Sequence, residues 1–271
     1  GPILSVISRL CYSSAFARRE TGMSASGKRP LIESFDFEPG RILARKYEVV
    51  QKLGGGWEGE VYIVRERSTG IERAGKFFFP HRNPNDRVSR LYAQKLHKLR
   101  GCEVLIQYHT EESITFQKVP ITFLISEYVE GEILKEFLSR QPGKRLSVFE
   151  GLHLLHALAQ GLEPVHNARE YHGDLHAENV IIKRRGLGFE LKLIDMFHWN
   201  SQKVENIRDD VCDCVRIFYD SIGGQKMYAK HPPVVKQVCC GLKRGLILKK
   251  YRTAGQLRRY LETLEWDSPR T

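Results

Sequence analysis

The stretch YHGDLHAENVII, Tyr171–Ile182, decides how this sequence is interpreted. Within it, Asp174 and Asn179 lie five residues apart, in a loop predicted between a long helix and a short apolar strand. In phosphoryl transfer this spacing lets the Asp orient an attacking hydroxyl while the Asn holds a magnesium ion. Because an Asp–Asn pair in a polar loop is more often only a turn, the interpretation depends on the elements before and after it.

A glycine cluster precedes this loop, where LGGGWEGEVY covers Leu53–Tyr62. The glycines at 54, 56 and 59 lie between two predicted strands, and glycine lets backbone N–H groups approach phosphate oxygens closely. A following strand that carries Val61 favours a phosphate-covering hairpin over a dinucleotide site. Fifteen residues after Val61, Lys76 follows Ala74 in an apolar strand, from which we expect it to reach phosphate oxygens.

An acid follows the loop. Asp195 ends the apolar run Lys192–Ile194, sixteen residues after Asn179. A strand-terminal turn is the ordinary explanation for such a residue, and a second magnesium ligand is the functional one. Four such features in the order that phosphoryl transfer uses favour the functional explanation.

Residue patterns divide the chain into a strand-rich first third and a helix-rich remainder, joined near Glu127–Gly131, which predicts an α+β protein of two lobes. Apolar and β-branched runs predict strands at 47–53, 60–65, 74–79, 105–109, 122–128, 180–183 and 191–194. Helical periodicity predicts helices at 88–99, 134–138, 148–165, 211–221, 233–244 and 253–264. The expected domains are an N-terminal extension (1–45), an N-lobe (46–127) and a C-lobe (128–267).

The composition is that of an ordinary globular protein, with 41% hydrophobic and 28% charged residues. The formal charge of +11 indicates an acidic partner, but no zinc finger or RNA-stacking signature accompanies it, so no nucleic acid partner is expected. No apolar run is long enough to cross a bilayer. The six cysteines form no C-x-x-C pair, which predicts free thiols and a cytoplasmic location.

The first residues are open to several interpretations. Gly1-Pro2 matches the remnant that a protease leaves after removal of a tag. Residues 3–19 contain Arg and Ser, no acid, and apolar residues at helical spacing, as in a transit peptide. An extension packed on the domain, or a start that overshoots a true initiator at Met23, explains them equally well.

Together these motifs resemble those of the protein-kinase-like superfamily, from about Tyr47 to Leu264. The sequence ISEYVEG, Ile125–Gly131, resembles the hinge between kinase lobes, with Ser126 at the gatekeeper position. The segment from Asp210 to Tyr219 resembles the start of the long central helix of kinases. The sequence RTA at 252–254 resembles the entry to the last helix, which favours the serine/threonine branch. The resemblance implies a small antiparallel sheet plus one helix in the N-lobe, and a helical C-lobe.

The resemblance also implies the cofactors ATP and Mg²⁺ and a role for each site residue. Asp174 would accept or orient the proton of the substrate hydroxyl, and Asn179 and Asp195 would bind magnesium. Lys76 would hold the α/β-phosphates, and His176 stands where protein kinases place a Lys beside the γ-phosphate. The other nucleotide-binding positions would be Leu53, Gly54, Gly56, Gly59, Val61, Ala74, Glu127, Val129 and Ile181.

Several residues depart from an ordinary protein kinase. The helix after Asp86 has no Glu, and Tyr92 stands where the partner of Lys76 is expected, so that Glu103 or an acid of the N-terminal extension would have to substitute. Gly173 replaces the Arg that binds a phosphorylated activation loop. The sequence Asp195-Met196-Phe197 replaces DFG, and only fifteen residues separate Asp195 from Asp210.

Three functions remain after these departures. The leading one is an atypical kinase that phosphorylates Ser/Thr on a protein with ATP and magnesium. HGDLH and the short activation segment favour instead a small-molecule kinase, similar to aminoglycoside and choline kinases, with a hydroxyl-bearing substrate. The missing Glu favours a pseudokinase that binds a nucleotide or a partner as an interaction module.

Overall fold

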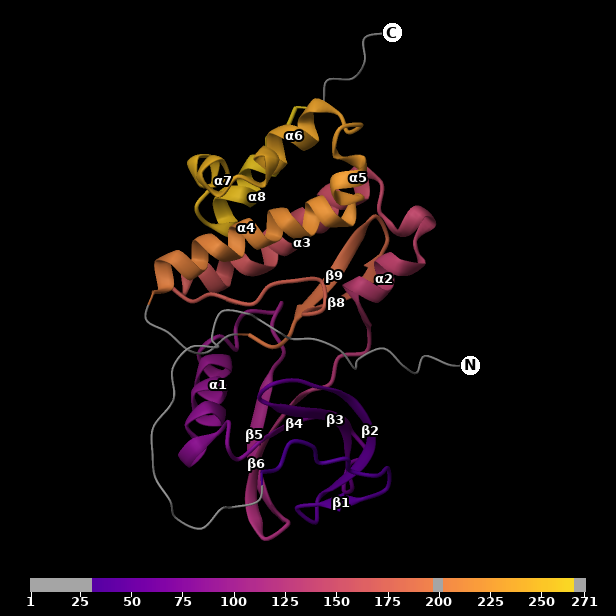
Figure 1. The fold of residues 1–271 in the computed structure, drawn as a ribbon, viewed down its shortest axis with the longest axis vertical. Helices are drawn as coiled ribbons and strands as arrows, with labels where there is room; N and C mark the ends of the chain where they lie inside the picture. Colours follow the sequence, from indigo (N-terminus) through magenta and orange to yellow (C-terminus); the bar gives the residue numbers. More distant parts are fainter. Residues whose placement is uncertain (1–30, 197–201, 266–271) are drawn as a thin grey trace. The chain divides into compact units, whose positions relative to one another are not determined.

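The computed structural model describes residues 31–196 and 202–265 (Figure 1). The chain divides into two compact units. Unit 1 comprises Gly1–Gln94 and Gln107–Tyr128, and unit 2 comprises Lys95–Ile106 and Val129–Thr271. The predictions for residues 1–30, for Phe197 and for the end of the C-lobe at 267 lie outside the described residues.

Unit 1 is built on a six-stranded antiparallel sheet with the strand order β1-β2-β3-β4-β6-β5. Its strands are β1 (Ile42–Leu43), β2 (Tyr47–Gly55), β3 (Gly59–Glu66), β4 (Glu72–Phe78), β5 (Tyr108–Phe116) and β6 (Val119–Glu127). The central strands alternate between two faces, as a pleated strand must. Tyr62 and Phe77 point into a buried aromatic and aliphatic core, and their neighbours along the strands point to the opposite face.

Residues before the first predicted strand contribute to that core. Ile32, Phe35 and Phe37 are almost fully buried in the same cluster as Tyr62 and Phe77. The ring of Phe35 stacks on that of Phe37 at a centroid distance of 5.3 Å. We call residues 32–37 the N-terminal strap, because they cross this face of the sheet before β1 begins.

The strap is held by a buried carboxylate on β3. Glu60 accepts hydrogen bonds from the Ser34 hydroxyl at 2.9 Å and from the backbone N–H of Phe35 at 3.2 Å. It also accepts bonds from Lys52 and from the Tyr62 hydroxyl, both at 2.5 Å. A buried carboxylate with four donors is fully compensated for its loss of water.

The helix that follows β4 begins where the Asn83–Asp86 cluster predicts. A 3-10 turn (Pro84–Asp86) leads into α1 (Arg87–Lys98). The Asn83 side-chain oxygen accepts hydrogen bonds from the backbone N–H groups of Val88 at 2.9 Å and Ser89 at 3.1 Å. Those groups have no partner within the helix, so Asn83 acts as its cap.

Unit 2 is mainly helical and also contains a small sheet (Figure 1). Its helices are α2 (Leu134–Arg140), α3 (Val148–Asn167), α4 (Lys203–Ser221), α5 (Gly224–Tyr228), α6 (Pro233–Cys239), α7 (Arg244–Lys250) and α8 (Ala254–Glu262). Ser147 and Glu150 form a capping box that starts α3. The helices α3 and α4 pack side by side. A buried imidazole, His166, accepts a hydrogen bond from the Ala254 backbone at 3.0 Å and lies 3.1 Å from Asp210, which links α3, α4 and α8.

The small sheet carries the predicted loop. It has the order β7-β8-β9, formed by β7 (Glu132–Ile133), β8 (Val180–Arg185) and β9 (Gly188–Leu193). Gly131 packs against Ile181 so closely that an added Cβ would lie 2.4 Å from its side chain. The sheet therefore places the segment before β8 next to the segment after β9.

The two-lobed α+β fold is confirmed, while several element limits differ from the predicted ones. Helix α4 begins at Lys203, not at residue 211, and α6 ends at Cys239, where Cys240 and Gly241 adopt left-handed backbone conformations. The strand predicted at 105–109 is displaced along the chain: Leu105 makes an isolated bridge, and β5 begins only at Tyr108 and runs to Phe116. Among the described residues, none of the helices combines the length and the apolar character that a bilayer crossing needs.

Candidate active site

The loop at 171–179 is held by a buried carboxylate of α4. Asp210 Oδ2 accepts a hydrogen bond from the backbone N–H of His172 at 2.7 Å, and Oδ1 accepts one from Gly173 at 2.8 Å. The imidazole of His172 is fully buried, and this burial lowers its pKa. It is therefore neutral, and its Nε2 donates to the Ile194 carbonyl at 2.9 Å. These bonds fix the loop backbone immediately before Asp174.

Three predicted site residues converge in this loop. The Asn179 side-chain nitrogen donates to the Asp174 carbonyl at 2.8 Å and to the Asp174 carboxylate at 3.3 Å. The same nitrogen lies 3.0 Å from His176 Nε2, which lies 3.7 Å from the Asp174 carboxylate. All of these bonds use the amide nitrogen, so the side-chain oxygen of Asn179 is directed away from them. An amide oxygen in this position is a suitable ligand for a hard cation.

The charges of the loop are coupled. Burial by itself would raise the pKa of Asp174, but the contact with His176 and its charge outweigh burial and lower it. The contact with the Asp174 carboxylate raises the pKa of His176, and the carboxylates of Glu178 and Asp195 add to this rise. An ionised carboxylate therefore lies beside an imidazole that is easily protonated.

Asp195 lies beside this loop in unit 2. The backbone N–H of Ile194 donates to the Asn179 carbonyl at 3.1 Å, which joins the end of β9 to the loop. Asp195 has a left-handed backbone, with φ of 54°, a conformation that non-glycine residues adopt rarely and mostly where the surroundings enforce it. The trio of Asp174, Asn179 and Asp195 is thus assembled from two neighbouring segments.

The predicted nucleotide-binding residues of unit 1 share the face of the sheet opposite the aromatic core. Val61 pairs with Lys76 across β3 and β4, and Ala74 pairs with Ser126 across β4 and β6. These side chains are only partly buried, except Ser126, whose hydroxyl donates to the Ala74 carbonyl at 3.5 Å. Small and apolar side chains around one ammonium group suit a flat apolar ring with a charged tail.

The glycine hairpin joins β2 to β3 through a tight turn. The backbone N–H of Gly56 donates to the Gly59 carbonyl at 2.8 Å. Gly59 tolerates no side chain, because a Cβ there would lie 1.8 Å from the Phe77 carbonyl oxygen. Gly56 by contrast has no atom within 4 Å of the place of a Cβ, so another molecule can approach its backbone.

Lys76 has a carboxylate partner that the sequence analysis did not consider. Its ammonium nitrogen lies 3.2 Å from Glu58 Oε2, and Glu58 belongs to the glycine hairpin. The same nitrogen lies 4.6 Å from the ring centroid of Tyr92, so Tyr92 does stand beside Lys76 as predicted. The signal for Glu58 in the sequence is its position before Gly59, where the turn directs it back toward β4.

The remaining predicted positions lie in both units. Leu53 and Gly54 lie on β2, and Glu127 ends β6, where its backbone N–H donates to Gln107 at 2.8 Å. In unit 2, Val129 lies in the segment before β7, and Ile181 lies on β8. Within unit 2, a cluster of three or more His, Cys, Asp or Glu side chains suited to a metal is absent from the described residues. The magnesium ligands implied here are one carboxylate and one amide, and such a pair fits an ion that also takes phosphate oxygens.

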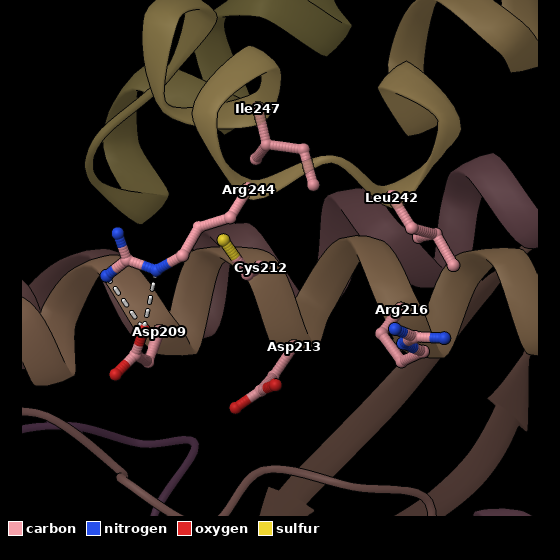
Figure 2. A pocket seen from close by; sticks show the side chains of 7 residues that line it. All are labelled: Asp209, Cys212, Asp213, Arg216, Leu242, Arg244 and Ile247. Atoms are coloured by element: carbon pink, nitrogen blue, oxygen red, sulfur yellow. Dashed lines mark hydrogen bonds and ion pairs between the residues drawn. The ribbon is translucent and has the colours of Figure 1, made fainter.

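A pocket of about 220 Å³ lies elsewhere in unit 2, between α4 and residues 242–247 (Figure 2). Figure 2 shows Arg244 bonded to Asp209, while Asp213 extends from α4 without a drawn partner. Burial, together with the charges of Asp210 and Asp209, raises the pKa of Asp213 to about 7. This pocket lacks the trio of Asp174, Asn179 and Asp195 and is not the candidate active site.

The sequence pattern of the protein kinase domain matches residues 47–212, more than half of the chain. The chain belongs to the protein kinase domain family. The kinase domain is 30% identical over 152 residues to human serine/threonine-protein kinase Nek11, covering 54% of this chain and 23% of that protein. It is also 30% identical over 161 residues to a probable serine/threonine-protein kinase of Streptomyces coelicolor, covering 58% of this chain and 23% of that protein. The chain thus spans about a quarter of the length of these relatives.

The fold of this kinase domain has a solved counterpart. The PknI kinase domain of Mycobacterium tuberculosis, a double mutant, superposes with a TM-score of 0.59 at 17% identity. The superposition covers 84% of this chain and 97% of the PknI chain. At this identity the likeness concerns the fold alone, and it agrees with the two-lobed prediction.

Proposed function

We propose that this chain is a phosphotransferase that uses ATP and magnesium to phosphorylate serine or threonine on a protein. The observation that carries the proposal is the arrangement of Asp174, Asn179 and Asp195 in unit 2. Buried hydrogen bonds fix this arrangement. Asp210 accepts bonds from the loop backbone before Asp174, and His172 donates to the carbonyl of Ile194, the residue before Asp195. A rigidly held set of oxygen ligands and a carboxylate is what phosphoryl transfer needs, because catalysis is mostly positioning and charge neutralisation.

The chain's own residues would divide the work as follows. Asp174 is ionised, and its lowered pKa makes it a weak base, so it would orient the substrate hydroxyl and take the proton late. The Asn179 amide oxygen and the Asp195 carboxylate would hold the metal. In unit 1, Lys76 would bind phosphate oxygens and Val61 and Ala74 would contact the adenine. When bound, ATP would supply the phosphoryl group and Mg²⁺ would neutralise its charge.

His176 would serve as a donor to phosphate. Its pKa is raised by Asp174, so a larger share of the imidazole is protonated near neutral pH than in free histidine. A charged imidazole then substitutes for the lysine that protein kinases carry at this position. The phosphate contact itself is part of the proposal.

Phosphoryl transfer from labelled ATP tests the proposal. Wild-type protein is incubated with Mg²⁺ and with a protein mixture, and in parallel with aminoglycosides and choline. Label on Ser/Thr in protein, lost in Asp174→Asn and retained in Asp209→Asn, is the expected result. Asp209 is a matched control, because its carboxylate is exposed and pairs with Arg244. The absence of turnover with every acceptor would contradict the proposal.

A small-molecule kinase is the second candidate, favoured by the histidine of HGDLH and by the short distance in sequence between Asp195 and Asp210. Label that appears only on a sugar or amine alcohol would establish it instead. Nucleotide-dependent thermal stabilisation without turnover would indicate a pseudokinase. A cytoplasmic location is part of the proposal and is tested by fractionation of cells that express the natural protein.

A further inference from the structure

We infer that Glu58 is the residue that positions Lys76, in place of the helix glutamate that this chain lacks. The inference rests on the proposed function, since it concerns the orientation of the phosphate-binding lysine. Glu58 lies two residues after Gly56 in the glycine hairpin, while α1 places Tyr92 where that glutamate is expected.

The contact is built from partly buried groups. Glu58 Oε2 lies 3.2 Å from Lys76 Nζ, and the two side chains expose only 22% and 15% of their surface. At such burial an ion pair is screened less by solvent than at an open surface. The contact therefore restricts the lysine side chain, which otherwise has several rotatable bonds.

Two aromatic rings also lie beside Lys76. Its ammonium lies 4.6 Å from the ring centroid of Tyr92 and 5.5 Å from that of Phe78. Ring faces attract a cation but do not fix its direction as a carboxylate does. Tyr92 and Phe78 thus keep the Lys76 ammonium in place, and Glu58 sets the direction of the ammonium N–H groups. An ammonium has three N–H groups, and a bond to Glu58 uses one of them.

The hairpin that carries Glu58 is itself anchored. The Glu58 carbonyl accepts a hydrogen bond from the backbone N–H of Phe79 at 2.9 Å. The neighbouring Trp57 ring packs on the Arg82 guanidinium at 3.8 Å from its centroid. Because Glu58 is tied to Lys76 on β4 and to Phe79 just after it, the position of the hairpin and the orientation of the lysine are coupled. In a kinase with the usual helix glutamate, these two are set by different elements.

Hydrogen–deuterium exchange of the nucleotide-free protein tests the contact without any activity. Glu58→Gln keeps the size of the side chain and removes its charge. We expect exchange of the amides at 54–59 to rise roughly two- to five-fold, the equivalent of one partly exposed ion pair. Lys76→Met should give the same rise, and the double variant no more than either one. Glu72→Gln, which breaks the partly exposed pair with Arg65 on the same strands, should leave the hairpin unchanged. Unchanged exchange in Glu58→Gln, or fully additive effects, would overturn the inference.

Turnover kinetics test the positioning role. Glu58→Gln should lower kcat about 10- to 100-fold, the usual cost of a misplaced group, with a smaller change in KM for ATP. Glu58→Asp, which restores the charge on a shorter side chain, should recover part of the loss. A kcat that is unchanged or higher in Glu58→Gln would mean that Glu58 only competes with the phosphates, and would overturn the inference. If wild-type protein shows no turnover, the proposed function fails, while the exchange experiment still decides whether Glu58 and Lys76 are coupled.

Discussion

Asp210 accepts a hydrogen bond of 2.8 Å from the backbone N–H of Gly173, 37 residues earlier in the chain. The second carboxylate oxygen accepts the preceding N–H, that of His172. Gly173 has φ of 83°, which a side chain would disfavour, so the bond and the turn depend on each other. One buried carboxylate of α4 therefore determines where Asp174 lies.

Replacing Asp210 tests this dependence. Asp210→Asn leaves one acceptor for two backbone donors, and an amide N–H would face the other donor. We expect a loss of roughly 1–3 kcal/mol in the free energy of unfolding, the cost of one buried unsatisfied donor, and a kcat at least ten times lower. Denaturant unfolding and turnover measure the two effects. Equal stability and turnover in wild type and variant would show that the loop is held by other contacts.

The pH dependence of turnover tests His176. The contact with the Asp174 carboxylate raises the pKa of His176, so its charged form persists to a higher pH than in free histidine and disappears as the pH rises through the raised pKa. We expect kcat to fall over the same pH range, above the ordinary value of about 6.5. His176→Lys should remove this fall, because a lysine stays protonated there. A pH profile that is identical in wild type and His176→Lys would assign the fall to another group.

Stability as a function of pH tests Asp213. Burial raises its pKa to about 7 in the folded protein, while the unfolded chain has the ordinary value of 3.8. The unfolded state therefore releases this proton first, and the folded state loses stability as the pH rises from 3.8 to about 7. Asp213→Asn should be more stable than wild type by roughly 2 kcal/mol at pH 8 and by less at pH 5. Chemical denaturation at both pH values measures the difference, and a constant difference would contradict the shift.

Glu60, which holds the N-terminal strap, should give stability the opposite dependence on pH. Burial by itself would raise the pKa of Glu60, but the hydrogen bonds from Lys52, Tyr62, Ser34 and Phe35 outweigh burial and lower it. Its stabilisation is complete above the ordinary value of 4.5 and is lost as the pH falls through the lowered one. We expect Glu60→Gln to cost about 1–3 kcal/mol at pH 7 and to flatten the acid limb of the unfolding curve.

Phe35→Ala is the matched comparison for Glu60→Gln. It removes a ring from the same strap and leaves the carboxylate in place, so stability should fall while the acid limb is preserved. An acid limb that is equal in wild type and Glu60→Gln would show that Glu60 does not titrate as described.

The candidate site could be predicted from the sequence where neighbouring residues alone determine its geometry. Asp174 and Asn179 share one loop, and the apolar run before Asp195 ends beside that loop through ordinary strand pairing. The alternation of β3 and β4 similarly places Val61 and Lys76 side by side. Each of these relations follows from a short-range period or spacing.

The partner of Lys76 could not be found in this way. The sequence analysis looked for an acid on the following helix, at Glu103 or in the N-terminal extension. Glu58 meets Lys76 because the turn closed by Gly56 and Gly59 directs the hairpin back over β4, which depends on tertiary packing. The start of α4 at Lys203 was missed for a similar reason. Its first turns contain polar residues such as Glu205 and Arg208, which pair with each other and conceal the apolar period.

The strap also determines where the polypeptide can be cut. A fragment limited to the family match at residues 47–212 would lack Phe35 and Phe37, and would leave Phe77 and Phe116 without the rings that cover them. It would also end two residues after Asp210, inside α4. Such a fragment would present a bare aromatic surface to water and would aggregate on expression, whereas one that spans 31–265 retains the N-terminal strap and the whole of α4.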